Sequence, residues 1–352
     1  MVFEANKVNK NITNGMGAMV MLHSSCQAVI EDEIQQVTSP WYQTLDQELG
    51  AAENVVIDWR KNGFLYFKQD ILAEIAQAGA TFSRGRANIE RIFGEIRSSG
   101  LTDTLRQQLI TAMSALQPPV TNLSAQTEVY LVKLKRFQED ISIPHENMEA
   151  TIAQVQMRET KLKAEIEAIN QHLSNLKNQI AADRTVIAKA KEARKADIVE
   201  TIFGVLLAPV TGGASLILAG IGVASIAEAE DKINKMQSQI VEYQGQIVSE
   251  QKELSDDEKI VTTLNALSMS TEFVLGDISN LTESLSALRV EWDVFNGELT
   301  GVIQKVQSAK TAADVAVQGA WFLAACKEWE AVSAFVINLQ QRQISTSRIQ
   351  VS

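Results

Sequence analysis

The chain of 352 residues is poor in proline, in cysteine and in basic charge. It has five prolines, far below the usual share of about 5%, and since proline ends helices the chain can form very long ones. Two cysteines exclude a disulfide scaffold and a cysteine-based zinc cluster. The 32 Lys and Arg residues against 43 Asp and Glu give a net charge of -11, which argues against a general nucleic-acid binder.

The chain also lacks a recognisable export signal. Its start, MVFEANKVNKNITNG, has no continuous apolar stretch behind a basic segment, so we expect no Sec-type signal peptide. Cytoplasmic residence and export by an unusual route both stay open. Cys26 and Cys326 are expected to be two buried thiols, and a disulfide between them is the alternative if the terminal helices pack together.

What the sequence does have is apolar material, at 45%, in a helical rhythm. That content is enough for a core and excludes general disorder. Strand signals are almost absent, and apolar residues recur at every third or fourth position. Breaks are expected at Pro40, at Ser99–Gly100, at Pro118–Pro119 and at Pro144.

The clearest pattern follows Pro144. Apolar residues from Met148 to Ile187 keep a heptad spacing with one skipped position on each flank, and this predicts one helix over about 145–200, on the order of 80 Å long. A second seam starts at Ile233, and Ser255 before an acidic turn predicts a new helix. The expected fold class is all-α: an elongated bundle of long antiparallel helices with an apolar hairpin head at one end.

One segment does not fit a soluble bundle. Residues 201–227, TIFGVLLAPVTGGASLILAGIGVASIA, carry no charge, and a stretch of this kind must be buried in protein or in lipid. The turn-type cluster of Pro209, Gly212 and Gly213 divides it into two arms. As helices, the arms would be roughly 16 and 21 Å long, short of the roughly 30 Å hydrocarbon core of a bilayer. The segment is therefore expected to be a hairpin between two long polar helices.

The expected domains are a helical tail bundle, formed by residues 1–197 with 230–352, and a hydrophobic head hairpin, residues 198–229. The candidate membrane-inserting residues are the large apolar residues of the two arms: Ile202, Phe203, Val205, Leu206, Leu207, Leu216, Ile217, Leu218, Ile221 and Val223. Basic residues before the first arm are candidates for contact with lipid headgroups; the alternative is an ordinary solvated helix face. They are Arg184, Lys189, Lys191, Arg194 and Lys195.

No catalytic motif is present in the sequence. His23, His145 and His172 have no partner at metal-binding helical spacing, and we expect them to be surface or boundary residues. No P-loop and no nucleophile-elbow motif occurs, and the abundant carboxylates are typical of coiled-coil surfaces. We expect a non-enzyme with no cofactor and no metal.

A long-helix bundle with the apolar hairpin TIFGVLLAPVTGGASLILAGIGVASIA in its middle third resembles the cytolysin A superfamily of α-helical pore-forming toxins. It looks most like the components of two- and three-part bacterial toxins, such as those of haemolysin BL and the non-haemolytic enterotoxin. The resemblance covers the whole chain as architecture and has no specific motif.

The resemblance implies a soluble, secreted component, a monomer or small oligomer, whose head is released by a target membrane or by one or two partner components. The head would then insert and the protomers would form a homo- or hetero-oligomeric lytic ring. Because the arms are short for a full span, two arrangements stay open: the head anchors in one leaflet, or it extends across with polar residues facing a water-filled lumen. The component role, the receptor, the ring stoichiometry, and a helical or β-tongue head in the soluble form are not decided by the sequence.

Two other interpretations are kept. The chain is a structural coiled-coil protein anchored permanently by the hairpin, or it is a soluble helical scaffold in which the hairpin is buried core. A permanently anchored protein needs detergent from the start, whereas a toxin component is soluble as made.

Overall fold

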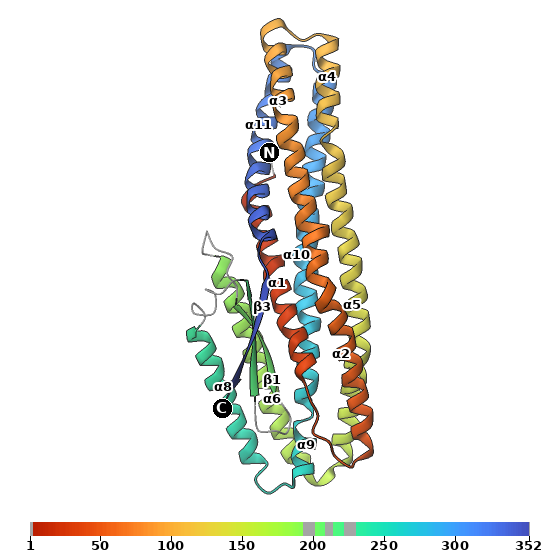
Figure 1. Cartoon of the computed structure of the whole chain (residues 1–352), viewed down its shortest axis with the longest axis vertical. Helices are drawn as coiled ribbons and strands as arrows, with labels where there is room; N and C mark the ends of the chain where they lie inside the picture. The colour runs from red at the N-terminus through yellow and green to blue at the C-terminus, as the bar shows by residue number, and fades with distance from the viewer. Residues whose placement is uncertain (1–2, 193–200, 208–213, 222–229, 352) are drawn as a thin grey trace. The chain divides into compact units, whose positions relative to one another are not determined.

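The structure is a computed structural model, and it describes residues 3–192, 201–207, 214–221 and 230–351. Long helices make up most of this part of the chain (Figure 1). The elements in chain order are α1 Ala5–Glu31, α2 Pro40–Tyr66, η1 Phe67–Ala73, α3 Glu74–Ser99, α4 Asp103–Ser114, α5 Gln117–Arg158, η2 Thr160–Leu162, α6 Lys163–Glu192, β1 Thr201–Leu207, β2 Ala214–Ile221, α8 Glu230–Glu250, α9 Asp256–Thr263, α10 Asn265–Ser308, α11 Ala312–Gln340 and β3 Ile344–Val351.

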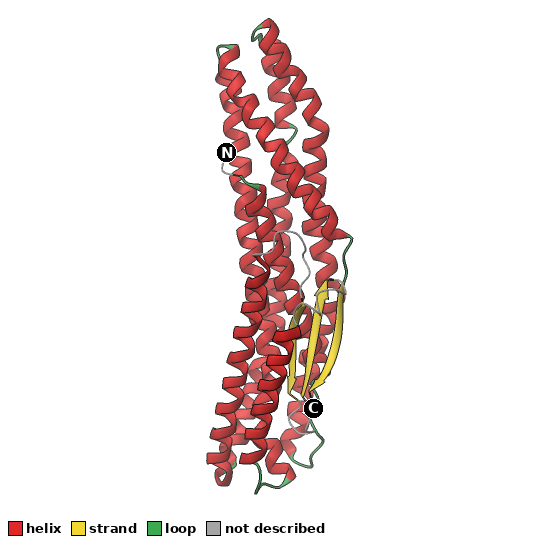
Figure 2. Ribbon diagram, turned by 90° about the vertical axis from the view of Figure 1, so that its left-hand side faces the viewer, coloured by secondary structure: helices red, strands yellow, loops and turns green. Residues whose placement is uncertain are grey.

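The predicted helical bundle is confirmed, and the described part of the chain adds a three-stranded sheet that an all-α class does not include. The sheet has the order β1-β2-β3, and both pairs are antiparallel. Figure 2 shows the three strands side by side in yellow. Hairpin and carboxyl-terminal tail thus meet in one sheet, although more than 120 residues separate them.

The chain divides into two compact units. The first consists of Met1–Thr13, Phe64–Lys133 and Thr282–Arg342. Its core is an aromatic cluster in which Trp329 stacks on Phe82, with ring centroids 5.1 Å apart, and on Trp292 at 5.8 Å. Phe3 reaches the same cluster, 4.6 Å from the ring of Phe295. Stacked and edge-on ring pairs contribute about 0.5–1.5 kcal/mol each beyond their buried area.

The second unit consists of Asn14–Gly63, Leu134–Leu281 and Gln343–Ser352, and it contains the sheet. Its heptad helices α6 and α8 lie side by side. Their apolar seams form one buried cluster with residues of α10 and of β3. The members are Ile169, Leu173, Leu176 and Ile180 of α6, Met236, Ile240 and Ile247 of α8, Ala266, Met269 and Phe273 of α10, and Val351 of β3.

The prediction of one helix over 145–200 is wrong at its start and in its middle. Pro144, predicted to end a helix, lies inside α5. A proline inside a helix removes one backbone hydrogen bond and its ring meets the carbonyl one turn earlier, at a cost of about 3 kcal/mol, and the 42-residue helix α5 continues through Pro144 despite that cost. The actual break follows Arg158: Glu159 leaves the helical region with ψ 65°, and α6 begins at Lys163. This break falls at the skipped heptad position between Val155 and Leu162.

Several predicted helix ends are confirmed. Gly100 ends α3 with φ 87°, a conformation that favours glycine. The pair Pro118–Pro119 lies in the first turn of α5, where proline is tolerated because the N–H groups have no helical partner. Ser255 caps α9 in a reciprocal capping box with Glu258. Cys26 and Cys326 are free and buried.

A capping box also starts α11, and its loss is the first prediction. The side chain of Thr311 accepts from the Asp314 N–H, and the Asp314 carboxylate accepts from the N–H groups of Lys310 and Thr311. We expect Thr311→Val to destabilise the protein by about 1 kcal/mol, as loss of a cap does, measured by urea unfolding.

The matched control is Thr81→Val within α3, which makes the same exchange away from a helix end. We expect a change within about 0.5 kcal/mol there. Equal effects of the two substitutions would show that the cap contributes nothing specific.

Candidate membrane-inserting hairpin

The apolar segment forms an antiparallel hairpin of two strands in the described part of the chain. β1 pairs with β2 in a continuous register from Thr201↔Gly220 to Leu207↔Ala214. Nine of the ten candidate inserting residues lie on these strands. β1 carries Ile202, Phe203, Val205, Leu206 and Leu207, and β2 carries Leu216, Ile217, Leu218 and Ile221. Val223 and the predicted turn residues Pro209, Gly212 and Gly213 lie outside the described residues.

The strand conformation answers the question that the sequence left open. Thr, Ile, Val and Phe fit strands well, while Gly204 and Gly220 weaken a helix. Each strand of seven or eight residues extends roughly 23–27 Å. Transmembrane strands usually need 9–11 residues, so the strands, like the helical arms first considered, are short for a full span.

The third strand was missed by sequence reasoning. β3 pairs with β2 from Ala214↔Val351 to Ile221↔Ile344, and it comes from the polar carboxyl-terminal segment of the chain. Its signal was weak: the alternation Ile349-Gln350-Val351 and a few β-branched residues. Val351 is 4% exposed and packs in the α6–α8 cluster, and Ile349 packs against it. Ala219 of β2 is also buried, at 1% exposure.

Arg184, the last basic residue before the hairpin with a described side chain, is buried, at 4% exposure. Its Nη2 lies 2.6 Å from Asp277 Oδ2 and donates to Ser25 Oγ at 2.8 Å and to the Met21 carbonyl at 3.4 Å. The Ser25 hydroxyl donates to the same Asp277 oxygen at 2.6 Å. The guanidinium also stands 4.9 Å from the ring of Phe273. The network joins α1, α6 and α10 in the second unit.

The predicted role of Arg184 as a headgroup contact or a solvated surface group is therefore wrong for this state. Burial raises the pKa of Asp277, which is 2% exposed, while Arg184 and Ser25 act in the opposite direction. Removing one partner of such a buried pair leaves an uncompensated charge. Lys189 and Lys191 lie on α6, and Arg194 and Lys195 fall outside the described residues.

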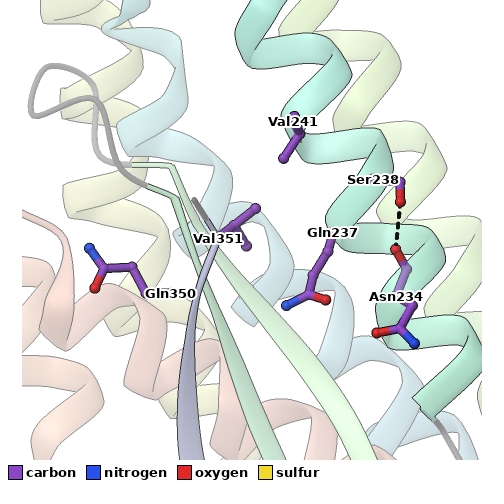
Figure 3. A pocket seen from close by; sticks show the side chains of 6 residues that line it. All are labelled: Asn234, Gln237, Ser238, Val241, Gln350 and Val351. Carbon is purple, nitrogen blue, oxygen red and sulfur yellow. Dashed lines mark hydrogen bonds between the residues drawn. The ribbon is translucent and has the colours of Figure 1, made fainter.

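A shallow cavity of about 480 Å³ lies beside the sheet, between α8 and β3 (Figure 3). Ser238 donates to the Asn234 carbonyl at 2.9 Å. Gln237 and Val351 extend into the space from opposite walls. The lining side chains are neutral amides, a hydroxyl and two valines, and they give no acid–base or nucleophilic chemistry. The residues are Asn234, Gln237, Ser238, Val241, Gln350 and Val351.

The histidines are partly buried boundary residues, as expected. His23 accepts from Arg60 Nε at 3.4 Å, and burial, with the Arg60 charge, lowers its pKa to about 4. His145 Nδ1 lies 2.7 Å from Thr271 Oγ1, and His172 lies near the ring of Tyr243. In the described ranges, no three His, Cys, Asp or Glu side chains gather as a metal site would need. Within those same ranges, no helix has the length and apolar character to cross a bilayer.

The fold has clear structural relatives. The HblL1 toxin component from Bacillus cereus aligns with a TM-score of 0.67 over 96% of this chain and 97% of its own, at 9% identity. The cytotoxin MakB from Vibrio cholerae aligns at 0.69 over 95% and 92%, at 15% identity. Soluble SmhA of the tripartite α-pore-forming toxin Smh, from Serratia marcescens, aligns at 0.67 over 97% and 95%, at 13% identity.

At these identities the similarity establishes a shared fold over nearly the whole length of each chain. No known sequence family and no curated protein matches this chain. The likeness predicted from the sequence, to the components of α-helical pore-forming toxins, is thus confirmed at the level of structure.

The Arg184 network generates the second prediction. Arg184→Met leaves the Asp277 carboxyl buried without its counter-ion, so we expect a loss of about 3–5 kcal/mol in urea unfolding. The double variant Arg184→Met/Asp277→Leu should recover most of the loss, since well-packed apolar residues often replace buried ion pairs without cost. If the free energy of unfolding of Arg184→Met lies within about 1 kcal/mol of the wild-type value, the pair of Arg184 and Asp277 does not stabilise the fold.

The loss of stability in the Arg184→Met variant should also depend on pH. Burial raises the folded-state pKa of Asp277, so the folded variant binds a proton more tightly than the unfolded chain does. Its stability should therefore fall as pH rises from the unfolded pKa of about 4 through the raised folded pKa. The double variant has no such carboxyl and should not show this dependence.

Proposed function

We propose that this chain is a soluble component of a multi-component α-pore-forming toxin. Its hydrophobic head would insert into the target membrane, and the protomers would then assemble into a lytic pore. The observation that carries the proposal is the 27-residue uncharged segment, whose described parts form a paired apolar hairpin between two long amphipathic helices. The shared fold with toxin components over nearly the whole chain supports it.

The proposed mechanism divides the chain into a tail bundle, residues 1–197 with 230–352, and a head, residues 198–229. The head is the part that meets lipid, because a charge-free backbone segment can enter hydrocarbon only if its N–H and C=O groups stay paired. A hairpin satisfies the inner edges of its two strands and leaves the outer edges open. Insertion thus requires a further partner for those edges or a change to helix.

The same reasoning favours assembly with other chains. Strands of this length do not span a bilayer alone, so the head is proposed to anchor in one leaflet or to extend with the help of neighbouring protomers. The proposed partners are the lipid bilayer, one or two other toxin components, and further copies in a ring. Release as a secreted protein is part of the proposal, as is the absence of enzymatic activity and of a cofactor.

Liposome flotation tests the proposal and gives the third prediction. We expect the wild-type protein to float with vesicles and the variant Leu206→Asp/Ile217→Asp not to float. A charged residue at the bilayer centre costs about 3 kcal/mol on insertion scales, so the two substitutions together oppose insertion strongly. The melting temperature of both proteins is measured alongside.

The matched control is Val248→Asp/Val317→Asp. It adds the same two charges to valines that are 66% and 67% exposed in this structure, and it should float like wild type. Loss of flotation in the hairpin variant with an unchanged melting temperature supports a membrane element. A sharp fall in its melting temperature would identify the hairpin as ordinary core, and wild-type protein that stays at the bottom with every candidate partner would refute the toxin assignment.

A further inference from the structure

The helix α11 of the first unit is apolar on two sides, and only one of them is buried. Its inner side packs on α3, where Trp329 stacks on Phe82 and the ring of Phe322 lies 6.3 Å from that of Phe93. Only four of its 29 residues are charged: Asp314, Lys327, Glu328 and Glu330. A helix that is apolar beyond its buried face needs a second surface to cover it.

The second apolar side is a heptad seam that faces solvent, and we call it the outer seam. Its exposed positions follow one another in steps of four and three residues, which is the a/d spacing of a coiled coil. They are Ala316, Ala320, Leu323, Lys327, Glu330, Ala334 and Ile337. The exposed side of the neighbouring helix α3 carries polar and charged residues instead: Arg84, Asn88, Arg91 and Arg97.

The outer seam is complementary to itself when a second copy runs in the opposite direction. With a two-fold axis midway between Lys327 and Glu330, Lys327 of each copy lies opposite Glu330 of the other. The same axis places Leu323 opposite Ala334 and Ile337 opposite Ala320. Each large side chain therefore meets a small one, which lets the layers of two helices interdigitate.

Glu330 is already held at the edge of the seam. Arg86 of α3 donates to its Oε1 at 2.5 Å, so the other carboxylate oxygen can accept from Lys327 of a second copy. The charges of the seam thus pair across an antiparallel contact, and no unpaired charge is buried in it.

The same residues disfavour a parallel pair. Two parallel copies in register would place Lys327 opposite Lys327 and Glu330 opposite Glu330, and like charges in an interface repel each other. Leu323 would then meet Leu323, while alanine would meet alanine and leave gaps between the wide layers. Charge and size therefore both select the antiparallel orientation.

We propose that the outer seam of α11 is a dimer interface, occupied by the outer seam of a second copy of this chain in antiparallel orientation. In solution the dimer covers an apolar face that would otherwise favour disordered association. The contact from Ala320 to Ile337 extends over roughly 25 Å. It lies at the small end of specific interfaces, so the dimer should dissociate on dilution.

This dimer is a state distinct from the proposed pore. Copies in a ring of three or more are related by rotation about one axis, and such a rotation does not turn one helix antiparallel to its neighbour. The dimer must therefore separate before a ring forms. That consequence rests on the proposed function, whereas the interface itself does not.

Sedimentation velocity tests the interface in the full chain without any membrane. The variant Ala320→Glu/Ala334→Glu places carboxylates opposite Ile337 and Leu323 of the second copy. Both alanines are exposed, and glutamate is a good helix former, so each copy should still fold. We expect wild type to change from monomer to dimer between about 1 and about 100 μM, and the variant to have a dissociation constant at least about a hundredfold higher.

The matched control is Ala87→Glu/Ala125→Glu, which adds the same charges at exposed alanines of α3 and α5. It should dimerise like wild type, and all three proteins should melt at the same temperature when dilute. Wild type that stays monomeric at about 100 μM overturns the proposal and leaves the outer seam to another toxin component or to lipid. Loss of the dimer in the control also overturns it, because association would then not depend on the outer seam.

Disulfide crosslinking tests the antiparallel register. Ala320→Cys and Ile337→Cys are made as two separate proteins, mixed and oxidised. In the proposed dimer, equal positions of the two copies lie roughly 25 Å apart along the helices, beyond the reach of a disulfide, whereas positions 320 and 337 lie opposite each other. The native thiols interfere little, since Cys26 and Cys326 are buried and burial raises the pKa of Cys326 to about 12.

We expect covalent dimers in the mixture and none in either protein alone. Crosslinking of either protein alone indicates a parallel pair and overturns the proposal, as does a mixture that stays uncrosslinked. Wild type that dimerises but never floats with vesicles counts against the proposed function and leaves the dimer interface standing. Wild type that floats but stays monomeric has the opposite meaning, so the two proposals fail separately.

Discussion

A strand with apolar side chains needs hydrogen-bond partners for its backbone N–H and C=O groups and also needs its side chains covered from water. The arrangement of the second unit depends on these two requirements. The hairpin strands satisfy each other along one edge. The second edge of β2 is satisfied by a strand from the far end of the chain. The seam between α6 and α8 receives Val351 of that strand. Since β1 also lies beside α6, both outer strands of the sheet contact the helices.

The buried ion pair of Arg184 and Asp277 has a related requirement, since buried charges also need partners. Arg184 and Asp277 tolerate burial because each satisfies the other, with Ser25 bridging them. The pair lies on α6, the helix that leads into the hairpin, and ties it to α1 and α10. A seam of leucine and isoleucine allows helices to slide by a heptad at modest cost, whereas one buried charge pair has a single acceptable register. The network thus fixes which turn of α6 faces which turn of its neighbours.

Sequence reasoning predicted the features that depend on local periodicity. The heptad seams, the glycine stop at Gly100 and the Ser255 cap are short-range patterns, and the structure has each of them. The hairpin was found because a long charge-free run is conspicuous on its own. The predictions that were wrong or missing concern residues whose structure depends on distant partners. Arg184 is buried because it pairs with Asp277, 93 positions away. The segment of β3 is a strand because it pairs with β2. The predicted helix end at Pro144 was wrong for a different reason, because the long helix α5 continues in spite of the hydrogen bond that proline removes.

The order of synthesis gives the distant strand pairing a consequence in time. β2 ends at Ile221 and β3 begins at Ile344, so 122 residues are made between the two strands. At about 5–20 residues per second, the ribosome takes roughly 6–24 seconds to produce them. During this interval the outer edge of β2 has no strand of its own chain to pair with. During this time the nascent chain exposes an apolar strand with one unpaired edge, so we expect a holding chaperone to bind it. The yield of folded protein on expression should then depend on how fast the last strand is synthesised.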